Sequence, residues 1–331
     1  MPQVTFDKSS YPLLENENVL DCLLRHKREI PHACKTGVCQ SCLVKAVDGT
    51  PSDRARNGLK QTLQADGYAL ACQWVPDADV TVKLPGLDES ATEVVIASMD
   101  RLGRGLMRLR LAPKPGCSLF QSRPGQYLNL INPAGVSRSY SIANDFVADG
   151  YVELHVASME KGVFTGWLFT EAKVGDLVHV RGPAGSCFYV KDVSQDFPIL
   201  LAGTGTGLAP LYGIAHDALR NRHSGPMTLL HGGRNSDRLY YVDELHSLAQ
   251  KHSTFRYRPL VLEAANDARV QQGDLLEAAL ASLDPARLAD TRVFLCGAPD
   301  FVQQLRRRIF MKGVKSSNIF CDAFVTRTVA A

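Results

Sequence analysis

Residues 32–42 decide the architecture of the first part of this chain; they read His32-Ala33-Cys34-Lys35-Thr36-Gly37-Val38-Cys39-Gln40-Ser41-Cys42. Together with Cys72, this segment holds four cysteines that are separated by four, two and twenty-nine residues. Three of the thiols come from one short loop, and the fourth comes from a distant part of the sequence. Small or flexible residues lie between the first three, so the loop backbone can closely approach whatever the sulfurs bind. We therefore expect metal ligands at Cys34, Cys39, Cys42 and Cys72.

Other kinds of cysteine site have different spacings. A structural zinc site usually pairs two short CxxC or CxxH knuckles, a Rieske centre needs two histidine ligands, and free thiols follow no fixed spacing. This sequence has neither a second knuckle nor a Cys-x-His step. Its spacing is the one by which plant-type ferredoxins hold a 2Fe-2S cluster. We predict such a cluster, keep zinc as the alternative, and expect His32 to lie in the loop without being a ligand.

The composition is that of a globular chain with several domains. The chain has 331 residues, of which 45% are hydrophobic, and a net charge of +3. This small charge argues against a nucleic-acid partner, and no apolar run is long enough to span a membrane. The N-terminal residues lack the features of a secretory signal, and the remaining cysteines are scattered without a disulfide framework. We expect a cytoplasmic protein with neither a nucleic-acid nor a membrane partner.

Changes in the sequence pattern divide the chain into three units, which we place at 1–88, 89–193 and 194–331. The first contains the cysteine motif, ends in an alternating strand and stops at a Pro-Gly pair. The second has short alternating segments separated by Gly and Pro turns, which predict an antiparallel β-barrel. In the third, buried strands alternate with helical segments, as in a parallel sheet built from βαβ units. The predicted fold class is therefore multidomain, with α+β and α/β parts.

The third unit contains a glycine-rich turn. An apolar strand at 197–203 runs directly into Thr204-Gly205-Thr206-Gly207-Leu208-Ala209-Pro210, and a helical pattern follows. Glycines let a backbone approach a pyrophosphate closely, and the helix directs its N-terminal dipole at the anion. The turn departs from the GxGxxG fingerprint, because Pro210 stands where the third glycine would be. It is either an ordinary turn or a nucleotide site, whose contacts we assign to Gly203, Gly205, Thr206, Gly207 and Pro210.

The second unit contains the segments Pro124-Gly125-Gln126-Tyr127 and Arg138-Ser139-Tyr140-Ser141. The latter matches the RxYS flavin motif of the ferredoxin-NAD(P)H reductase superfamily, and the former matches the segment that precedes this motif in the family. With the cysteine motif and the glycine turn, it makes the whole chain resemble members of that superfamily that are fused to an N-terminal plant-type ferredoxin of the β-grasp fold. Such proteins are reductase components of Rieske-type and diiron oxygenases. The resemblance implies FAD in the second unit and NAD(P)H in a Rossmann-like third unit.

The resemblance also assigns residues to the flavin. In the family, the motif's arginine pairs with the flavin pyrophosphate, its tyrosine lies against the isoalloxazine ring, and its last serine bonds near N5. These roles fall on Arg138, Tyr140 and Ser141, with Ser139 between them. A guanidinium suits a phosphate, an aromatic face suits a flat ring, and a hydroxyl can tune the reacting nitrogen.

A segment at 161–168 resembles the family's helix opening that holds the flavin phosphate. Gly162 and Thr165 occupy the matching positions. Without the family, the same segment predicts a surface helix with Thr165 as its N-cap. The two interpretations are compatible, because a helix N-terminus is itself suited to a phosphate.

The end of the chain supplies further candidates. Residues 293–299 resemble the family's CGxP turn, whose cysteine lies beside the nicotinamide, so the resemblance makes Cys296 and Gly297 coenzyme-binding residues. Cys296 and Ser141 then flank the path of the hydride as the catalytic residues. The last strand ends near Phe324, which matches the aromatic residue that covers the flavin in plant-type members. Asp322 is a candidate for the acidic residue that some members keep there.

Coenzyme choice depends on the turn after the second strand of the third unit, where Arg234 follows Gly232-Gly233. An acid at this place binds the ribose 2′-hydroxyl of NAD, whereas an arginine accommodates a 2′-phosphate. Oxygenase-reductase relatives with a similar Gly-x-Arg turn mostly use NADH. We therefore favour NADH and keep NADPH as possible.

The predicted function follows from electron counts. A nicotinamide gives two electrons as hydride and a 2Fe-2S cluster accepts one, so a flavin must stand between them. The resemblance implies an NADH-dependent reductase that passes electrons through FAD and the cluster to the terminal oxygenase component of a dioxygenase or monooxygenase in aromatic hydrocarbon catabolism, or to another protein acceptor. Two alternatives stay open. One is a reductase that serves a pyridoxamine-dependent deoxysugar dehydratase, and the other is a non-catalytic redox sensor or electron carrier.

Overall fold

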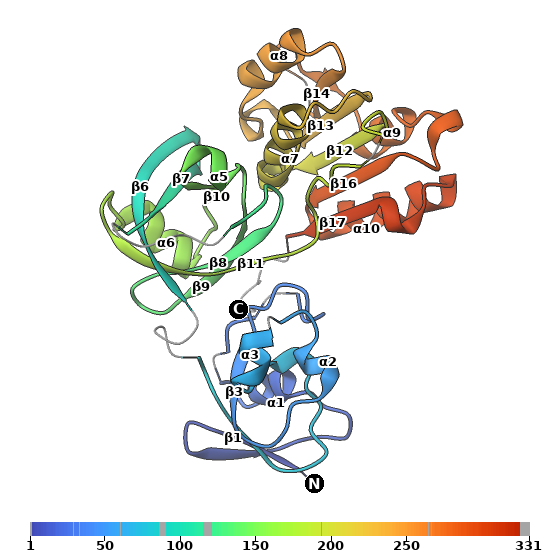
Figure 1. Cartoon of the computed structure of the whole chain (residues 1–331). Helices are drawn as coiled ribbons and strands as arrows, with labels where there is room; N and C mark the ends of the chain where they lie inside the picture. The colour runs from blue at the N-terminus through green and yellow to red at the C-terminus, as the bar shows by residue number, and fades with distance from the viewer. Residues whose placement is uncertain are drawn as a thin grey trace.

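A computed structural model describes residues 2–28, 30–32, 34–59, 61–85, 91–114, 121–192, 194–263, 265 and 267–324. Figure 1 shows three units that follow one another along the chain: an N-terminal unit in blue, a green barrel, and a C-terminal unit in yellow to red. Each unit is built on its own β-sheet. The buried apolar side chains form separate cores in the N-terminal unit, in the barrel, and on the two sides of the C-terminal sheet.

The N-terminal unit is a five-stranded mixed sheet in the order β2-β1-β5-β3-β4. Its central pair, β1 and β5, is parallel, and the other pairs are antiparallel. Helix α1 begins after Asn18, whose side chain accepts a hydrogen bond from the Asp21 amide, as an N-cap residue should. The elements are β1 (Gln3–Phe6), β2 (Ser9–Pro12), α1 (Val19–Arg25), β3 (Leu43–Asp48), α2 (Asp53–Arg56), α3 (Gln61–Ala65), β4 (Tyr68–Leu70), the 3-10 turn η1 (Ala71–Gln73) and β5 (Val80–Lys83).

The second unit is a six-stranded antiparallel sheet in the order β10-β7-β6-β11-β8-β9. A bridge between Ile142 and Leu154 joins the end of β9 to β10, so the two edges of the sheet meet and the sheet closes into a barrel. The elements are β6 (Thr92–Gly103), β7 (Leu106–Pro113), β8 (Tyr127–Ile131), β9 (Ser137–Ser141), α5 (Phe146–Asp149), β10 (Val152–Ala157), α6 (Val163–Thr170) and β11 (Leu177–Ala184).

The third unit is a six-stranded parallel sheet in the order β15-β14-β13-β12-β16-β17. The chain runs outward from β12 in one direction and then returns to β16 on its other side. This reversal creates the crevice in which such sheets bind ligands, at the carboxyl ends of β12 and β16. The elements are β12 (Ile199–Thr204), η2 (Gly205–Gly207), α7 (Leu208–Arg220), β13 (Met227–Gly233), η3 (Ser236–Arg238), α8 (Val242–Lys251), β14 (Phe255–Val261), β15 (Gln271–Gln272), α9 (Leu275–Ala281), η4 (Pro285–Arg287), β16 (Arg292–Gly297), α10 (Pro299–Lys312), η5 (Ser316–Asn318) and β17 (Ile319–Ala323).

The predicted fold class is confirmed, including the β-grasp unit, the antiparallel barrel and the parallel sheet. The predicted N-cap at Thr165 is wrong. Helix α6 begins at Val163 with Gly162 as its cap, because the Gly162 carbonyl accepts the first helical hydrogen bond, from the Gly166 amide. The proposed unit boundaries stay predictions, since residues 86–90 and 193 lie outside the described part of the chain. Within the described residues, no helix is long and apolar enough to cross a lipid bilayer.

Candidate functional site

The four motif cysteines lie together in the N-terminal unit as two pairs. Cys34 and Cys39 are joined by two reciprocal hydrogen bonds. The Cys39 amide donates to Cys34 Sγ at 3.3 Å, and the Cys34 amide donates to Cys39 Sγ at 3.4 Å. Cys72 lies beside Cys42, and the Gln73 side-chain amide donates to Cys72 Sγ at 3.4 Å. Within the described residues, no three His, Cys, Asp or Glu side chains converge on a single metal position. Two neighbouring thiol pairs are the donor set of a diiron cluster, in which each iron takes two cysteines.

The local electrostatics favour thiolates at one member of each pair. The Cys39 thiol donates to Cys34 and lowers the pKa of Cys34 to about 4, although burial opposes the change. The Cys42 thiol acts in the same way on Cys72, whose pKa falls to about 7. The same hydrogen bonds raise the pKa values of the donors Cys39 and Cys42. The fit to a 2Fe-2S cluster therefore rests on geometry: two adjacent thiol pairs, with backbone amides such as that of Thr36 directed at the sulfurs.

The flavin motif occupies β9 and points in two directions. Side chains alternate along a strand, so Arg138 and Tyr140 lie on one face while Ser139 and Ser141 lie on the other. The Tyr140 ring packs on Phe164 of α6, with ring centroids 5.6 Å apart, and burial raises the Tyr140 pKa. The structure thus brings the predicted ring-covering tyrosine to the helix that the sequence assigns to the flavin phosphate.

At the start of α6, the predicted phosphate residues pack tightly. A side chain at Gly162 would overlap Met159 and the Thr165 hydroxyl, so only glycine fits there. Thr165 is buried, and its hydroxyl accepts a hydrogen bond from the Met159 amide at 3.2 Å. Thr165 therefore stabilises the turn before the helix, and its contact with a flavin phosphate stays a prediction.

The other face of β9 reaches the third unit. Ser141 Oγ donates to Asp322 Oδ2 on β17 at 2.6 Å, although the two residues are 181 positions apart. Burial raises the pKa of Asp322 to about 6, and the hydrogen bond from Ser141 opposes this change. Asp322 lies opposite Cys296 in the pairing of β16 with β17. Ser141, Asp322 and Cys296 therefore gather where the barrel meets the parallel sheet.

Cys296 itself is fully buried, with 0% of its surface exposed. Its sulfur lies 3.8 Å from that of Cys187, and burial raises the Cys296 pKa. The thiol is thus neutral and faces Cys187, so its proposed contact with the nicotinamide stays a prediction. Phe324 is half-buried beside the same turn, and its amide donates to the Gly297 carbonyl at 2.8 Å.

The glycine turn after β12 is built by close backbone approach. A Cβ at Gly207 would lie 2.6 Å from the Cys296 carbonyl carbon, and one at Gly203 would lie 2.7 Å from Leu211 Cδ1. Gly205 differs, because it has a φ of +54° and open space around its Cα. The turn therefore leaves half-buried backbone at Gly205 and Thr206, just before α7, while buried Pro210 lies in the first turn of that helix. This geometry suits a pyrophosphate.

Arg234 follows β13, as expected, but it is not an isolated cation. Its Nε donates to Glu263 Oε1 at 2.8 Å, and the Arg234 side chain is 80% exposed. The Glu263 amide also donates to the Arg234 carbonyl. The turn that the sequence assigns to coenzyme choice thus presents a carboxylate beside the arginine.

Comparison with known proteins agrees with this arrangement. Family models match a 2Fe-2S iron-sulfur cluster binding domain at 7–77, an oxidoreductase FAD-binding domain at 93–189 and an oxidoreductase NAD-binding domain at 201–307. The reductase subunit of an Amycolatopsis aromatic O-demethylase is 33% identical over 87% of this chain and 87% of its own. The reductase component of a Pseudomonas phenol 2-monooxygenase is 30% identical over 94% of this chain and 90% of its own.

The chain belongs to the ferredoxin-fused NAD(P)H reductases. A solved Amycolatopsis cytochrome P450 reductase has the same fold, with a TM-score of 0.68 and 27% identity, and the match covers 98% of this chain and 99% of that one. This reductase is therefore an NAD(P)H-dependent oxidoreductase with binding domains for a 2Fe-2S cluster, FAD and NAD.

The sequence analysis missed a buried polar network between the barrel and the third unit of the reductase. Glu153 and His155 on β10 are 4% and 3% exposed. Glu153 binds Arg110 at 2.9 Å, and His155 lies 2.9 Å from the Tyr240 hydroxyl. The Tyr241 hydroxyl donates to Glu153 at 3.3 Å. The only sequence signal for this network is the strand Val-Glu-Leu-His-Val at 152–156, in which polar residues alternate with apolar ones. Such alternation more often indicates a strand whose polar side chains face solvent.

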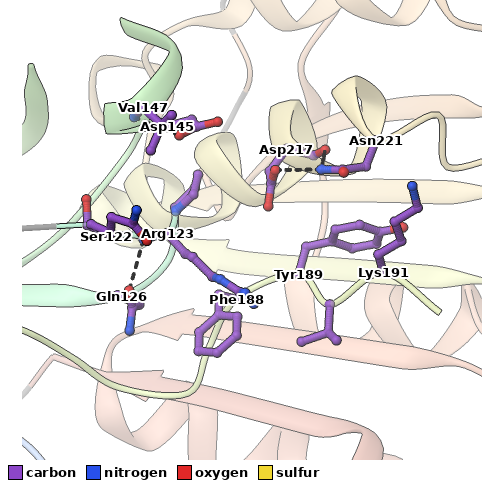
Figure 2. A pocket seen from close by; sticks show the side chains of 13 residues that line it. Ser122, Arg123, Gln126, Asp145, Val147, Phe188, Tyr189, Lys191, Asp217 and Asn221 are labelled. Atoms are coloured by element: carbon purple, nitrogen blue, oxygen red, sulfur yellow. Dashed lines mark hydrogen bonds between the residues drawn. The ribbon is translucent and has the colours of Figure 1, made fainter. Parts of the chain in front are cut away.

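A separate cavity of about 540 Å³ lies between the barrel and the third unit. Figure 2 shows its lining, where the Arg123 guanidinium stacks over the Phe188 ring and Asn221 is hydrogen-bonded to Asp217. Pro124 and Gln126, from the segment that precedes the flavin motif, are among the lining residues. The cavity therefore borders the flavin barrel, although none of the residues assigned above to the cluster, the flavin or the coenzyme lines it.

Replacing Arg138 by alanine should yield protein that purifies with little FAD. A charge-assisted bond to a phosphate contributes about 1.5–3 kcal/mol, so flavin affinity should fall about tenfold to a hundredfold. The measurement is the ratio of flavin to protein after gel filtration. Lys114→Ala, which removes a cation paired with Glu93 in the same barrel, is the control. Stoichiometric flavin in the Arg138 variant would remove this residue from the site.

Proposed function

We propose that this reductase takes electrons from NADH and passes them through FAD and the 2Fe-2S cluster to the terminal oxygenase component of a multicomponent dioxygenase or monooxygenase. One observation carries the proposal. Strand β9 touches both neighbouring units from the same face, because Ser139 Oγ lies 2.9 Å from Ser41 Oγ in the cluster loop and Ser141 binds Asp322 of the third unit. The flavin motif thus stands between the site for the electron donor and the site for the cluster.

When bound, FAD would supply the conversion of a two-electron hydride into single electrons. The chain's own residues supply position and proton handling. Tyr140 and Phe164 form an aromatic wall that excludes water from one side of the motif. Ser141 Oγ can donate a hydrogen bond to a reacting nitrogen only by leaving Asp322, whose carboxylate holds a proton below about pH 6. Asp322 therefore controls which way the Ser141 hydroxyl points.

The proposed partner is a protein, and the proposed compartment is the cytoplasm. The relatives that share the three domains are described as components that serve a demethylase or a monooxygenase, which supports an oxygenase as the acceptor. The described cysteines are all unpaired, and free thiols persist in reducing compartments. A deoxysugar dehydratase as acceptor and a redox sensor without turnover are the alternatives that the experiment must separate.

The decisive experiment is anaerobic stopped-flow absorbance of the holoprotein mixed with NADH and, separately, with NADPH. We expect fast loss of the flavin absorbance with NADH, followed by loss of the cluster absorbance. Protein that contains flavin and iron but reacts with neither coenzyme would overturn the reductase function and favour the sensor. If the reduced protein passed electrons to a deoxysugar dehydratase but to no oxygenase component, the dehydratase would be the acceptor and the proposed oxygenase partner would be wrong.

Coenzyme preference should respond to Glu263. We propose that its carboxylate neutralises Arg234 and repels a 2′-phosphate, which supports NADH as the coenzyme. Glu263→Gln should raise kcat/KM for NADPH about fivefold, since exposed ion pairs contribute up to ~1 kcal/mol, and should leave the value for NADH nearly unchanged. Glu277→Gln breaks an exposed pair with Arg308 in the same unit and is the matched control. An NADPH value unchanged from the wild type would show that Glu263 does not select the coenzyme.

A further inference from the structure

Asn129 lies at the point where the cluster loop meets the flavin barrel. It belongs to β8, directly opposite Ser139 in the pairing of β8 with β9. Its Oδ1 accepts hydrogen bonds from Ser139 Oγ at 2.7 Å and from Ser41 Oγ at 3.1 Å. Its Nδ2 donates to the Cys39 carbonyl at 3.4 Å. One amide therefore contacts the flavin motif, the residue between two cluster cysteines, and the backbone of a cluster ligand.

A second contact strengthens this junction. Tyr127 lies two residues before Asn129, on the same face of β8, and its hydroxyl donates to the Val38 carbonyl. Two successive carbonyls of the cluster loop, those of Val38 and Cys39, are thus bound by two successive outward side chains of one strand. Because β8 is also paired with the flavin strand, the loop is fixed relative to β9 and not merely to the barrel surface.

The burial of this junction shows that the contact is specific. Asn129 is 5% exposed and Ser41 is 8% exposed. Their hydrogen bonds to water have therefore been replaced by a hydrogen bond between the two side chains. Buried polar groups are costly unless they are paired, and these pairs form only when the two units adopt this one relative position. An apolar contact of the same area would tolerate sliding, whereas these hydrogen bonds do not.

We propose that Asn129 is a positioning residue that holds the cluster loop against the flavin strand and so sets the rate of electron transfer from flavin to cluster. The proposal rests on the reductase function proposed above. Each transfer would move one electron and reduce one ferric iron to ferrous. Because the cluster takes up one electron at a time, the protein acceptor would reoxidise it before the second transfer. The two transfers together would use the two electrons that NADH delivers as hydride, and the accompanying proton would pass to solvent. Asn129 takes no part in the bond changes; it acts through the Cys39 carbonyl and Ser41.

The test compares Asn129→Ala with the wild type as holoproteins, after flavin and iron contents have been matched. We expect NADH to reduce the flavin at the wild-type rate in anaerobic stopped-flow. Cluster reduction should then be slower by about tenfold or more, because loss of this buried bonding is expected to weaken docking by that factor, ~1.4 kcal/mol. Hydrogen–deuterium exchange supplies a readout that does not depend on turnover. Exchange should accelerate in residues 36–42 and remain unchanged in β6 and β7.

Gln40→Ala is the matched control, because Gln40 lies in the same loop but its side-chain amide donates to Gly58 within the N-terminal unit. This variant should keep the wild-type rate of cluster reduction. Ser41→Ala removes the partner of Asn129 in the N-terminal unit. This variant tests the same proposal if Asn129→Ala fails to fold. Wild-type cluster reduction in Asn129→Ala, or in Ser41→Ala where that variant is needed, would overturn the positioning role. Absence of flavin reduction by NADH in the wild type would instead refute the reductase function itself.

Discussion

Replacing Cys39 by serine should abolish cluster-dependent reduction of cytochrome c and leave the reduction of bound flavin by NADH largely intact. A serine hydroxyl cannot replace the thiolate as an iron ligand. Without Cys39, the Cys34–Cys39 pair would have only one sulfur left to hold its iron. The barrel and the third unit do not depend on the cluster for their cores. The outcome is measured by iron analysis and by electron paramagnetic resonance of the reduced protein. Steady-state reduction of cytochrome c and the rate at which NADH bleaches the flavin complete the comparison.

Cys22→Ser is the control for the loss of a thiol in the same unit. Cys22 is buried in α1 and bonds only weakly, to the Pro12 carbonyl at 3.6 Å, so it has no place among the ligands. This variant should retain its iron and its cytochrome c activity. Full cytochrome c activity in the Cys39 variant would contradict a path through the cluster, whatever its iron content.

Replacing Glu153 by leucine should destabilise the protein by about 3 kcal/mol, at the lower end of the range for breaking a buried ion pair, because Arg110 can turn toward water. Burial alone raises the pKa of Glu153, but hydrogen bonds and charges from His155 and Arg110 outweigh it and lower this pKa to about 2. Burial lowers the pKa of His155, and its hydrogen bond with Glu153 opposes this change. Arg110 stays charged at every pH considered, so it is the permanent cation beside Glu153. Thermal unfolding followed by circular dichroism measures the change.

The effect of Glu153 should also depend on pH. Its folded pKa lies below the ordinary value of 4.5, so its contribution is complete above about pH 4.5 and is lost as pH falls toward 2. Glu93→Gln, which breaks an exposed pair with Lys114 in the same barrel, is the control and should barely change the unfolding temperature. A Glu153 variant as stable as this control would show that the network does not join the two units.

The clustering of the four motif cysteines and the order of the three units could be predicted because both depend on local patterns. The spacing of Cys34, Cys39 and Cys42 lies within one loop, and the period of hydrophobic residues changes at each unit. The nucleotide turn was also local, since strand, glycines and helix follow directly along the chain. The cap of α6 was wrong because the backbone at Gly162, rather than the threonine side chain, decides where that helix begins.

The residues that join the units could not be predicted in the same way. Asn129 and Ser41 are 88 positions apart in the sequence, and so are Glu153 and Tyr241. Neither pairing leaves a periodic trace in the sequence. Glu153 and His155 alternate with apolar residues as solvent-facing side chains do, but the third unit covers that face of β10. Only the packing of whole units against one another reveals these partners.

The alternating faces of β9 limit how this protein can evolve. Arg138 and Tyr140 serve one side of the strand, while Ser139 and Ser141 bond to the two neighbouring units from the other. A substitution changes one of these contacts, but an inserted or deleted residue reverses every side chain beyond it. Lineages descended from a common ancestor should therefore tolerate single substitutions in this segment more readily than any change in its length. Recombination between such lineages should succeed only when both breakpoints leave β8, β9 and the cluster loop from the same parent.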